Sequence, residues 1–288
     1  MENTVLQKKT NPLTGHMRQP KIYIKLPSGG KYWPDGSLNI SVNGEYPVYS
    51  MTAKDELMLK TPDALLNGQG VIDVIQSCMP NVINAWATPN MDIDVILIAL
   101  RIASYGHLLP ITVTHELLEN GQQEFEVDMR TLLDDLQTNI TWDERIEVRP
   151  NLVLYIKPFD YKTVNASNIS EFETQRIINV VGDANMSEED KLLAFKESFQ
   201  KLTSITVDLI NKAVYKIDSD AGSTDDPEFI KEFMENTDVD VFDAVKERLD
   251  DLRERNKVKP FKINVSSDQD NPIWTEVPIV FDYASFFA

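Results

Sequence analysis

The sequence predicts an α+β fold: small antiparallel sheets and hairpins with a buried helical core, plus an acidic all-helical region. Three observations carry this prediction. Residues 95–103 are apolar on nearly every side of a helix, which is typical of a buried helix. Short alternating segments, separated by Asp-Gly and Asn-Gly turns, indicate hairpins around it. Farther on, helix-start signals recur, and residues 183–255 carry 20 acidic against 10 basic side chains.

Composition restricts the classes of partner. The 288 residues include 28 Lys and Arg against 46 Asp and Glu, which gives a net charge of −18. Non-specific nucleic-acid binding and anionic-membrane binding both need a basic surface, so we expect neither. No apolar run is long enough to cross a membrane, and residues 1–19 lack the apolar centre of a signal peptide. Cys78 is the single cysteine, which excludes an intrachain disulfide and suits a reducing cytosol.

The residue pattern of the first part of the chain predicts a flexible arm followed by strands. Residues 1–19 are polar and without periodicity, and we expect a flexible arm, either a disordered tail or a tether that orders on a partner. Four short strands are predicted next, broken by turns at Asp35-Gly36 and Asn43-Gly44: 21–26, 31–33, 37–42 and 47–51.

Three helix starts follow these strands. Thr52 with Asp55 has the spacing of a capping box, Thr61-Pro62-Asp63 is a second start, and Asn90 precedes the apolar helix over 93–103. After Gly106 the pattern predicts a hairpin over 111–118 and 122–129, a short helix over 130–137, and two strands within 141–156 joined at 149–151.

The remainder predicts helices and then a return to strands. Helices are expected near 170–181, 188–202, 204–217, 227–235 and 239–255, with an exposed mobile loop over 218–226. Strands are expected at 261–265 and 277–283. We therefore divide the chain into an arm (1–19), an α+β body (20–165), an acidic helical region (166–257) and C-terminal strands that pack back on the body (258–288).

Several of these segments resemble a known family. The run SMTAKDELMLKTPDALLNGQGVIDVIQSCMPN (50–81), then DIDVILIALRIASYG (92–106), preceded by KLPSGGKYW (25–33), is similar to the baseplate hub assembly proteins of T4-like contractile-tailed bacteriophages. The likeness covers residues 20–137 well and the rest loosely. It implies a non-enzymatic role in baseplate hub assembly, as chaperone or hub subunit, through binding other hub proteins. Self-association of the chain stays open. The implied location is the host bacterial cytoplasm during assembly, or the virion tail baseplate.

The hairpins at 111–128 and 261–283 share an order of strand, polar turn and strand, and whether they are related repeats stays open. The resembled family often has Cys-x-x-Cys pairs in such hairpins. Neither has a cysteine here, so we expect no metal in them.

The sequence shows no catalytic signature. His107 and His115 lie near Glu116, but a metal needs three or more converging ligands, and we predict no metal, no cofactor and no catalytic residue. The acid pair Asp92 and Asp94 lies at a helix start, where carboxylates complement the helix dipole. The alternative is a cell-wall-degrading tail-associated hydrolase, which would need paired carboxylates with perturbed pKa values in a deep cleft.

Aromatic side chains near the two ends of the chain are the candidate partner-binding residues. They either pack in the core or contact another hub protein, and the two terminal phenylalanines either dock on their own chain or anchor in a neighbour. The candidates are Tyr32, Trp33, Trp274, Phe286 and Phe287.

Overall fold

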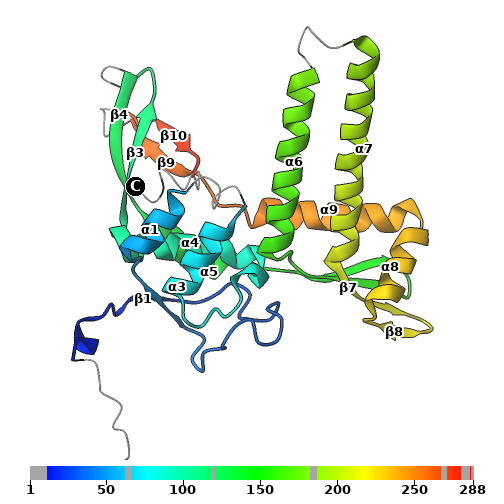
Figure 1. The fold of residues 1–288 in the computed structure, drawn as a ribbon, viewed down its shortest axis with the longest axis horizontal. Helices are drawn as coiled ribbons and strands as arrows, with labels where there is room; N and C mark the ends of the chain where they lie inside the picture. Colours follow the sequence, from blue (N-terminus) through cyan, green and yellow to red (C-terminus); the bar gives the residue numbers. More distant parts are fainter. Residues whose placement is uncertain are drawn as a thin grey trace, which may run out of the picture.

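The computed structural model describes residues 12–61, 67–118, 121–181, 187–266, 271–279 and 286. The predicted α+β class is confirmed. The described strands pair antiparallel in three two-stranded sheets and one four-stranded sheet, and helices pack against them (Figure 1). Buried apolar side chains form three clusters, and each cluster corresponds to one part of the fold.

The first cluster is the core of the N-terminal part. Its elements are β1 (Pro20–Ile24) paired with β2 (Tyr46–Tyr49), α1 (Ala53–Leu59), α3 (Gln69–Cys78), η2 (Ala85–Ala87), α4 (Asn90–Tyr105) and α5 (Met129–Asn139). A short turn, η1 (Thr14–His16), precedes them. The predicted capping box at the start of α1 is present: the Thr52 side chain accepts from the Asp55 backbone N–H, and the Asp55 carboxylate accepts from the Thr52 backbone N–H.

Helix α4 is the predicted buried helix. Ile96 and Leu100 are fully buried, because α3 and α5 pack against α4 and the β1–β2 hairpin contacts it as well. The prediction over 93–103 is therefore confirmed. A helix that is apolar on nearly every side needs neighbours all round, and these elements supply them.

Two hairpins form another part of the fold, and their buried side chains are the third and smallest cluster. β3 (Leu108–Thr114) pairs with β4 (Gln122–Asp128), and β9 (Phe261–Asn264) pairs with β10 (Trp274–Val277). Although about 140 residues separate them along the chain, they share one small cluster in which Val113 and Leu118 meet Ile263 and Val265. Figure 1 shows the two hairpins side by side in one projection at one end of the molecule.

The part that contains the second cluster is built on the four-stranded sheet. Its order is β5 (Arg145–Arg149), β6 (Leu152–Ile156), β7 (Val214–Ser219) and β8 (Gly222–Thr224). Helices α8 (Pro227–Asn236) and α9 (Val239–Arg255) pack on it and complete the second cluster. The turn predicted at 149–151 is confirmed, and Asn151 takes a φ of +68° there.

Between β6 and β7 the chain forms a long helical hairpin. α6 (Tyr161–Val181) and α7 (Glu188–Ala213) pack along each other, and both stand out from the molecule on the same side as the β3–β4 hairpin (Figure 1). No described helix is apolar over a length sufficient to span a bilayer.

The N-terminal strands differ from the prediction. The sequence predicts strands over 31–33 and 37–42, but the structure has none there: Leu38 makes a single bridge to Val82, and the rest is turn and loop. The cause is non-local, because the backbone of Ser37 and Asn39 bonds to residues 81–84 rather than to a neighbouring strand.

The acidic region also differs, since it is not all-helical. The helices predicted over 188–202 and 204–217 form one helix, α7, and residues 214–219 are the strand β7, which β6 pairs with across its whole length. The segment 218–226, predicted as a mobile loop, contains the turn and second strand of the β7–β8 hairpin. Pairing with a sheet outweighs local helical preference here.

Two predicted elements lie partly outside the described residues: the helix starting at Thr61-Pro62 and the strand over 277–283. Of the latter, only Val277 is in β10. The division of the chain at residues 19, 165 and 257 stays a prediction. What the structure shows is that 145–156 and 214–224 share one sheet.

Candidate functional site

One buried carboxylate ties the loop after β1 to the start of α4. Asp92 is fully buried and accepts hydrogen bonds from the Ser28 backbone N–H at 2.8 Å and from the Ser28 hydroxyl at 2.5 Å. The Trp33 indole N–H donates a third at 2.8 Å. Gly29 and Gly30 take φ values of +59° and +86°, which allow the chain to turn between Ser28 and Trp33. The KLPSGGKYW and DIDVILIAL segments are thus joined by hydrogen bonds to the Asp92 carboxylate.

The protonation of Asp92 follows from this position. Burial raises the pKa of its carboxyl to about 6, although the hydrogen bonds from Ser28 and Trp33 act to lower it. Burial also raises the pKa of the neighbouring Asp94 to about 6. Raised pKa values occur at catalytic acids, but the Asp92 oxygens are taken up by donors of its own chain. This arrangement supports a structural role for Asp92.

The five candidate partner-binding residues do not form one patch. Trp33 is 8% exposed and Phe286 is 2% exposed, both within the first cluster, and Tyr32 packs against that cluster. Of the two alternatives for the terminal phenylalanines, Phe286 therefore docks on its own chain. Trp274 on β10 is 60% exposed, and Phe287 lies outside the described residues. A partner could reach Trp274 directly but could reach Trp33 only by opening the core.

Tyr32 belongs to a polar junction between the first and second clusters. The Glu144 carboxylate, just before β5, accepts from Lys31 Nζ at 2.7 Å, from the Tyr32 hydroxyl at 3.2 Å and from the Tyr215 hydroxyl at 3.1 Å. The Tyr32 ring also meets Trp142 edge-on, with centroids 6.3 Å apart. Residues from the N-terminal loop and from β7 thus share one anion.

The pKa values at this junction have clear causes. Burial opposes ionisation of Glu144, but hydrogen bonds from Lys31, Tyr215 and Tyr32 outweigh it, and the pKa of the carboxyl is lowered. Burial, followed by the bond to Glu144, raises the pKa of the Tyr215 phenol to about 12. Burial and the Glu144 charge raise the pKa of the Tyr32 phenol as well. Both phenols therefore stay protonated and act as donors.

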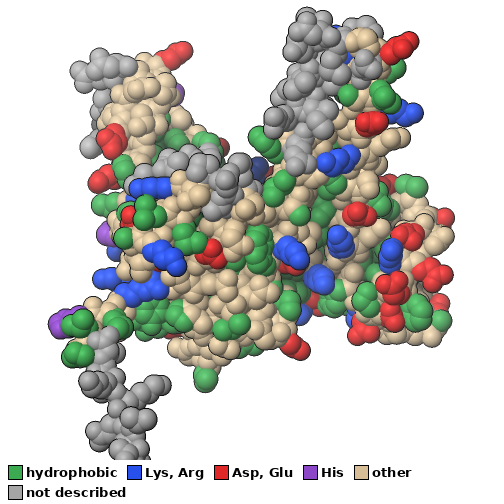
Figure 2. Space-filling model, viewed as in Figure 1, with side chains coloured by type: hydrophobic (Ala, Val, Ile, Leu, Met, Phe, Trp, Pro, Cys, Tyr) green, Lys and Arg blue, Asp and Glu red, His purple; other side chains and the backbone are tan. Residues whose placement is uncertain are grey.

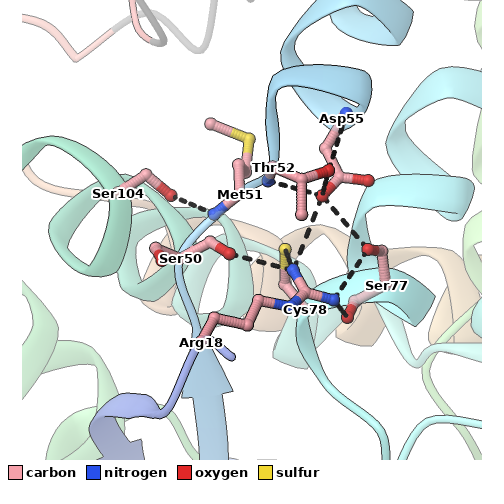
Figure 3. Close-up of polar contacts among 8 residues, drawn as sticks. All are labelled: Arg18, Ser50, Met51, Thr52, Asp55, Ser77, Cys78 and Ser104. Carbon is pink, nitrogen blue, oxygen red and sulfur yellow. Dashed lines mark hydrogen bonds and ion pairs between the residues drawn. The ribbon is translucent and has the colours of Figure 1, made fainter. Parts of the chain in front are cut away.

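A second polar network holds the end of the predicted arm (Figure 3). Arg18 donates to the Ser50 carbonyl at 2.9 Å and to the Ser77 hydroxyl at 3.1 Å, and pairs with the Asp55 carboxylate at 3.6 Å. Asp55 also accepts from the Thr52 hydroxyl at 2.8 Å and from the Ser77 hydroxyl at 3.1 Å. The arm is thereby fixed to α1 and α3 at its last residues.

Cys78 lies beside this network as a buried thiol. Burial, followed by the nearby Asp55 charge, raises the pKa of the Cys78 thiol to about 11, while Arg18 acts to lower it. A thiol with this pKa holds almost no thiolate near neutral pH, so it packs as a small apolar group. No sequence pattern indicated that Arg18 contacts it, because the contact spans 60 residues.

The acidic surface covers β8, α8 and α9. Residues 218–255 carry 14 acidic and 5 basic side chains. Figure 2 shows acidic side chains gathered over the part that Figure 1 labels α8 and β8. Some of these acids are engaged: Arg149 donates to Asp238 at 2.8 Å and to Asp240 at 2.7 Å, which ties the start of α9 to β5. Others, including Glu232, Glu235 and Glu247, are exposed and have no ion pair among the described residues.

Metal-type clusters are not found in the described part of the chain: no group of three or more His, Cys, Asp and Glu side chains there could hold one metal ion. His115 and Glu116 line a shallow hollow at the tip of the β3–β4 hairpin together with Thr114 and Gly121.

Comparison with known proteins gives one match. A family model described as T4 bacteriophage base plate protein matches residues 17–287. No curated protein and no solved structure matches the chain. The matched range includes all three clusters, the α6–α7 hairpin and the polar contacts around Asp92, Glu144 and Arg18.

Proposed function

Because the chain belongs to the family of T4 bacteriophage base plate proteins, we propose that it takes part in assembly of the baseplate hub by binding other hub proteins, as chaperone or as hub subunit. No catalytic step is part of this proposal. The protein would act in the host bacterial cytoplasm while the hub assembles, and then either remain in the tail baseplate or leave it.

The acidic surface on α8 and α9 is the observation that supports a docking role. Its acidic residues outnumber its basic ones by 14 to 5 over residues 218–255, so the surface repels a second acidic surface and complements a basic one. Exposed charges are screened over about 8 Å at physiological salt, so the attraction acts mainly on the rate of encounter. We therefore propose a basic hub protein as the partner.

The test compares two triple variants of equal charge change. One is Glu232→Gln, Glu235→Gln and Glu247→Gln on the acidic surface. The matched control is Glu116→Gln, Glu124→Gln and Glu126→Gln on the β3–β4 hairpin, where all three side chains are also exposed. Each hub protein of the same phage is presented in turn as a purified partner, and association rates are measured by surface plasmon resonance over a salt series.

The acidic-surface variant is expected to associate more slowly than wild type at low salt, with a weaker salt dependence, while the control matches wild type. Equal slowing in both variants would mean that net charge alone matters, and the acidic surface would then not be the docking site. Deleting 166–257 is unsuitable as a test, because it removes β7 and β8 from the sheet.

Trp274 is the second part of the proposal. Its ring is 60% exposed beside Ile273, which is 44% exposed, and exposed aromatic side chains are common anchors at interfaces. Trp274→Ala is expected to increase the dissociation rate of the same hub partner. An unchanged dissociation rate would remove Trp274 from the interface without touching the acidic surface.

A further inference from the structure

Helix α7 carries a row of apolar side chains on its outer side. Leu192, Phe195 and Phe199 are 70%, 51% and 64% exposed, at spacings of three and four residues. At about 100° per residue they fall within a sector of roughly 60° on the helix. Leu193, next in the chain to Leu192, is 55% exposed as well. We call Leu192, Phe195 and Phe199 the α7 stripe, and Figure 2 shows hydrophobic side chains on the surface of this projection.

The stripe is not the side of α7 that packs within its own chain. Ser198 is 4% exposed and lies about 60° around the helix from Phe195, 100° from Phe199 and 120° from Leu192, so the buried side adjoins the stripe only at Phe195. The α6–α7 hairpin thus buries one side of α7 and leaves the stripe outside. Elsewhere α7 meets β7, α8 and α9, and there the chain is buried, as Ile210 at 4% exposure shows.

We propose that the α7 stripe is an interface between two copies of this chain, in which two α6–α7 hairpins pair as a four-helix bundle. An antiparallel pair of long helices buries one side of each helix only, and pairing with an equal hairpin is the common way to bury another. A twofold interface of this kind brings the same side chains together from both copies.

The distribution of charge favours a second copy over a basic partner. α6 and α7 together carry 7 acidic and 6 basic residues, whereas residues 218–255 carry 14 and 5. The hairpin is thus a nearly neutral part of a strongly acidic chain, and it projects away from the acidic surface (Figure 1). Two copies can meet there without bringing their acidic surfaces together, while a basic partner is drawn to α8 and α9 instead.

The exposed area is of the size that such an interface needs. With aromatic side chains contributing about 150–250 Å² each, the exposed parts of the three stripe residues amount to roughly 350 Å² of apolar surface per copy. Two copies bury roughly twice this, and a polar rim brings the total to about 1,200 Å², the lower end of the range typical of specific interfaces. On a monomer, an apolar patch near 350 Å² is at the level that marks a binding surface.

The first experiment measures the mass of the purified full chain by sedimentation equilibrium over a hundredfold concentration series. Wild type is expected to dimerise. The double variant Phe195→Asp and Phe199→Asp is expected to raise the dimer dissociation constant at least tenfold, with unchanged helix content by circular dichroism. Phe229→Asp is the control for placing an acid at an exposed phenylalanine, because Phe229 on α8 is 60% exposed and lies outside the hairpin. It should leave the dimer intact.

The second experiment locates the interface without disturbing the stripe. Thr203→Cys places a thiol within about 40° of Leu192 and Phe199 around the helix, and Ser204→Cys places one about 100° farther round. Both positions are exposed, and the native Cys78 is buried. Mild oxidation is expected to cross-link two copies of the Thr203→Cys variant but not two copies of the Ser204→Cys variant.

Three results would overturn this proposal. Wild type could be monomeric at every concentration, the double variant could dimerise as well as wild type, or cross-linking could be equal at positions 203 and 204. A monomer whose stripe variant loses a hub protein would assign the stripe to that protein instead. The sedimentation and cross-linking experiments use the purified chain alone. Their outcome is therefore independent of the proposed docking of the acidic surface.

Discussion

The indole N–H of Trp33 donates a hydrogen bond at 2.8 Å to the carboxylate of Asp92, 59 positions further along the chain. Both residues are buried, and the Ser28 hydroxyl donates to the same carboxylate oxygen. The bond joins the loop after β1 to the first turn of the buried helix α4. The N-terminal loop is therefore held by a specific polar contact as well as by packing.

Replacing Trp33 by phenylalanine tests this contact. Trp33→Phe keeps an aromatic ring but removes the N–H donor, and losing a hydrogen bond to a charged group costs about 1.5–3 kcal/mol. We expect the free energy of unfolding, measured by urea denaturation, to fall by that amount. Trp274→Phe is the control, with an exposed ring, and should change stability little. Equal effects in the two variants would contradict a specific role for the indole.

The pH dependence of stability should report the burial of Asp92. Its folded-state pKa of about 6 lies above the value of about 3.9 in an unfolded chain, so the folded protein binds the proton more tightly. Between about pH 4 and pH 6 the folded state then holds more protons than the unfolded state, and this group's contribution to stability falls as pH rises.

The measurement is the free energy of unfolding of wild type minus that of Asp92→Asn, from pH 4 to pH 7. This difference is expected to decrease with rising pH, by up to about 3 kcal/mol for a shift of two pKa units. Subtracting the variant removes the contributions of the other acids. A difference that stays flat or grows with pH would mean that the Asp92 carboxylate is ionised at little cost.

Leu100 tests the packing around α4. It is fully buried, and Leu100→Ala should lower the free energy of unfolding by roughly 2–5 kcal/mol through lost contacts and the cavity left behind. Leu57→Ala on α1 is the control, because Leu57 is 68% exposed. The readout is the urea midpoint at constant m-value. A midpoint unchanged by Leu100→Ala would be incompatible with a close-packed core at this position.

The sequence was most informative where burial is uniform. Residues 95–103 are apolar at every position except Arg101, and no other environment suits such a helix, so α4 could be predicted. β7 could not be predicted. Val214–Ser219 is short and follows a helix of 26 residues, and its strand conformation depends on pairing with β6, which no local pattern records.

The polar contacts were harder to predict for the same reason. A carboxylate at a helix start, such as Asp92, is explained by the helix dipole alone, and nothing near it in the chain indicates that Ser28 is its partner. The sequence could identify aromatic residues as candidates for the core or for an interface, but not which of them are buried and which are exposed. Trp33 and Trp274 have the same side chain, and only the fold decides that one is buried and the other exposed.

Arg18→Ala should release the last residues of the arm. Removing the guanidinium deletes its bonds to the Ser50 carbonyl and the Ser77 hydroxyl, and we expect faster amide hydrogen exchange over residues 12–19. The Arg18–Asp55 pair is partly exposed, so global stability should change by about 1 kcal/mol or less. Arg130→Ala, which removes an exposed pair with Asp128, is the control. Unchanged exchange in the arm would show that other contacts hold it.

The junction at Glu144 gives the last prediction. In Glu144→Gln the negative charge that raises the pKa of the Tyr215 phenol is gone, while the burial of the ring remains. The pKa of Tyr215 should therefore move from about 12 toward its ordinary value without reaching it. The measurement is an NMR titration with ring-labelled tyrosine.

Glu147→Gln is the matched control, since Glu147 is exposed on β5 and pairs with Arg145. It should leave the Tyr215 titration unchanged. If Glu144→Gln also left it unchanged, the carboxylate would not reach the phenol in solution. Glu144 would then not be an anion that the N-terminal loop and β7 share. A shift in Glu144→Gln alone would establish that the Tyr215 phenol and the Glu144 carboxylate meet in solution, as their distance of 3.1 Å requires.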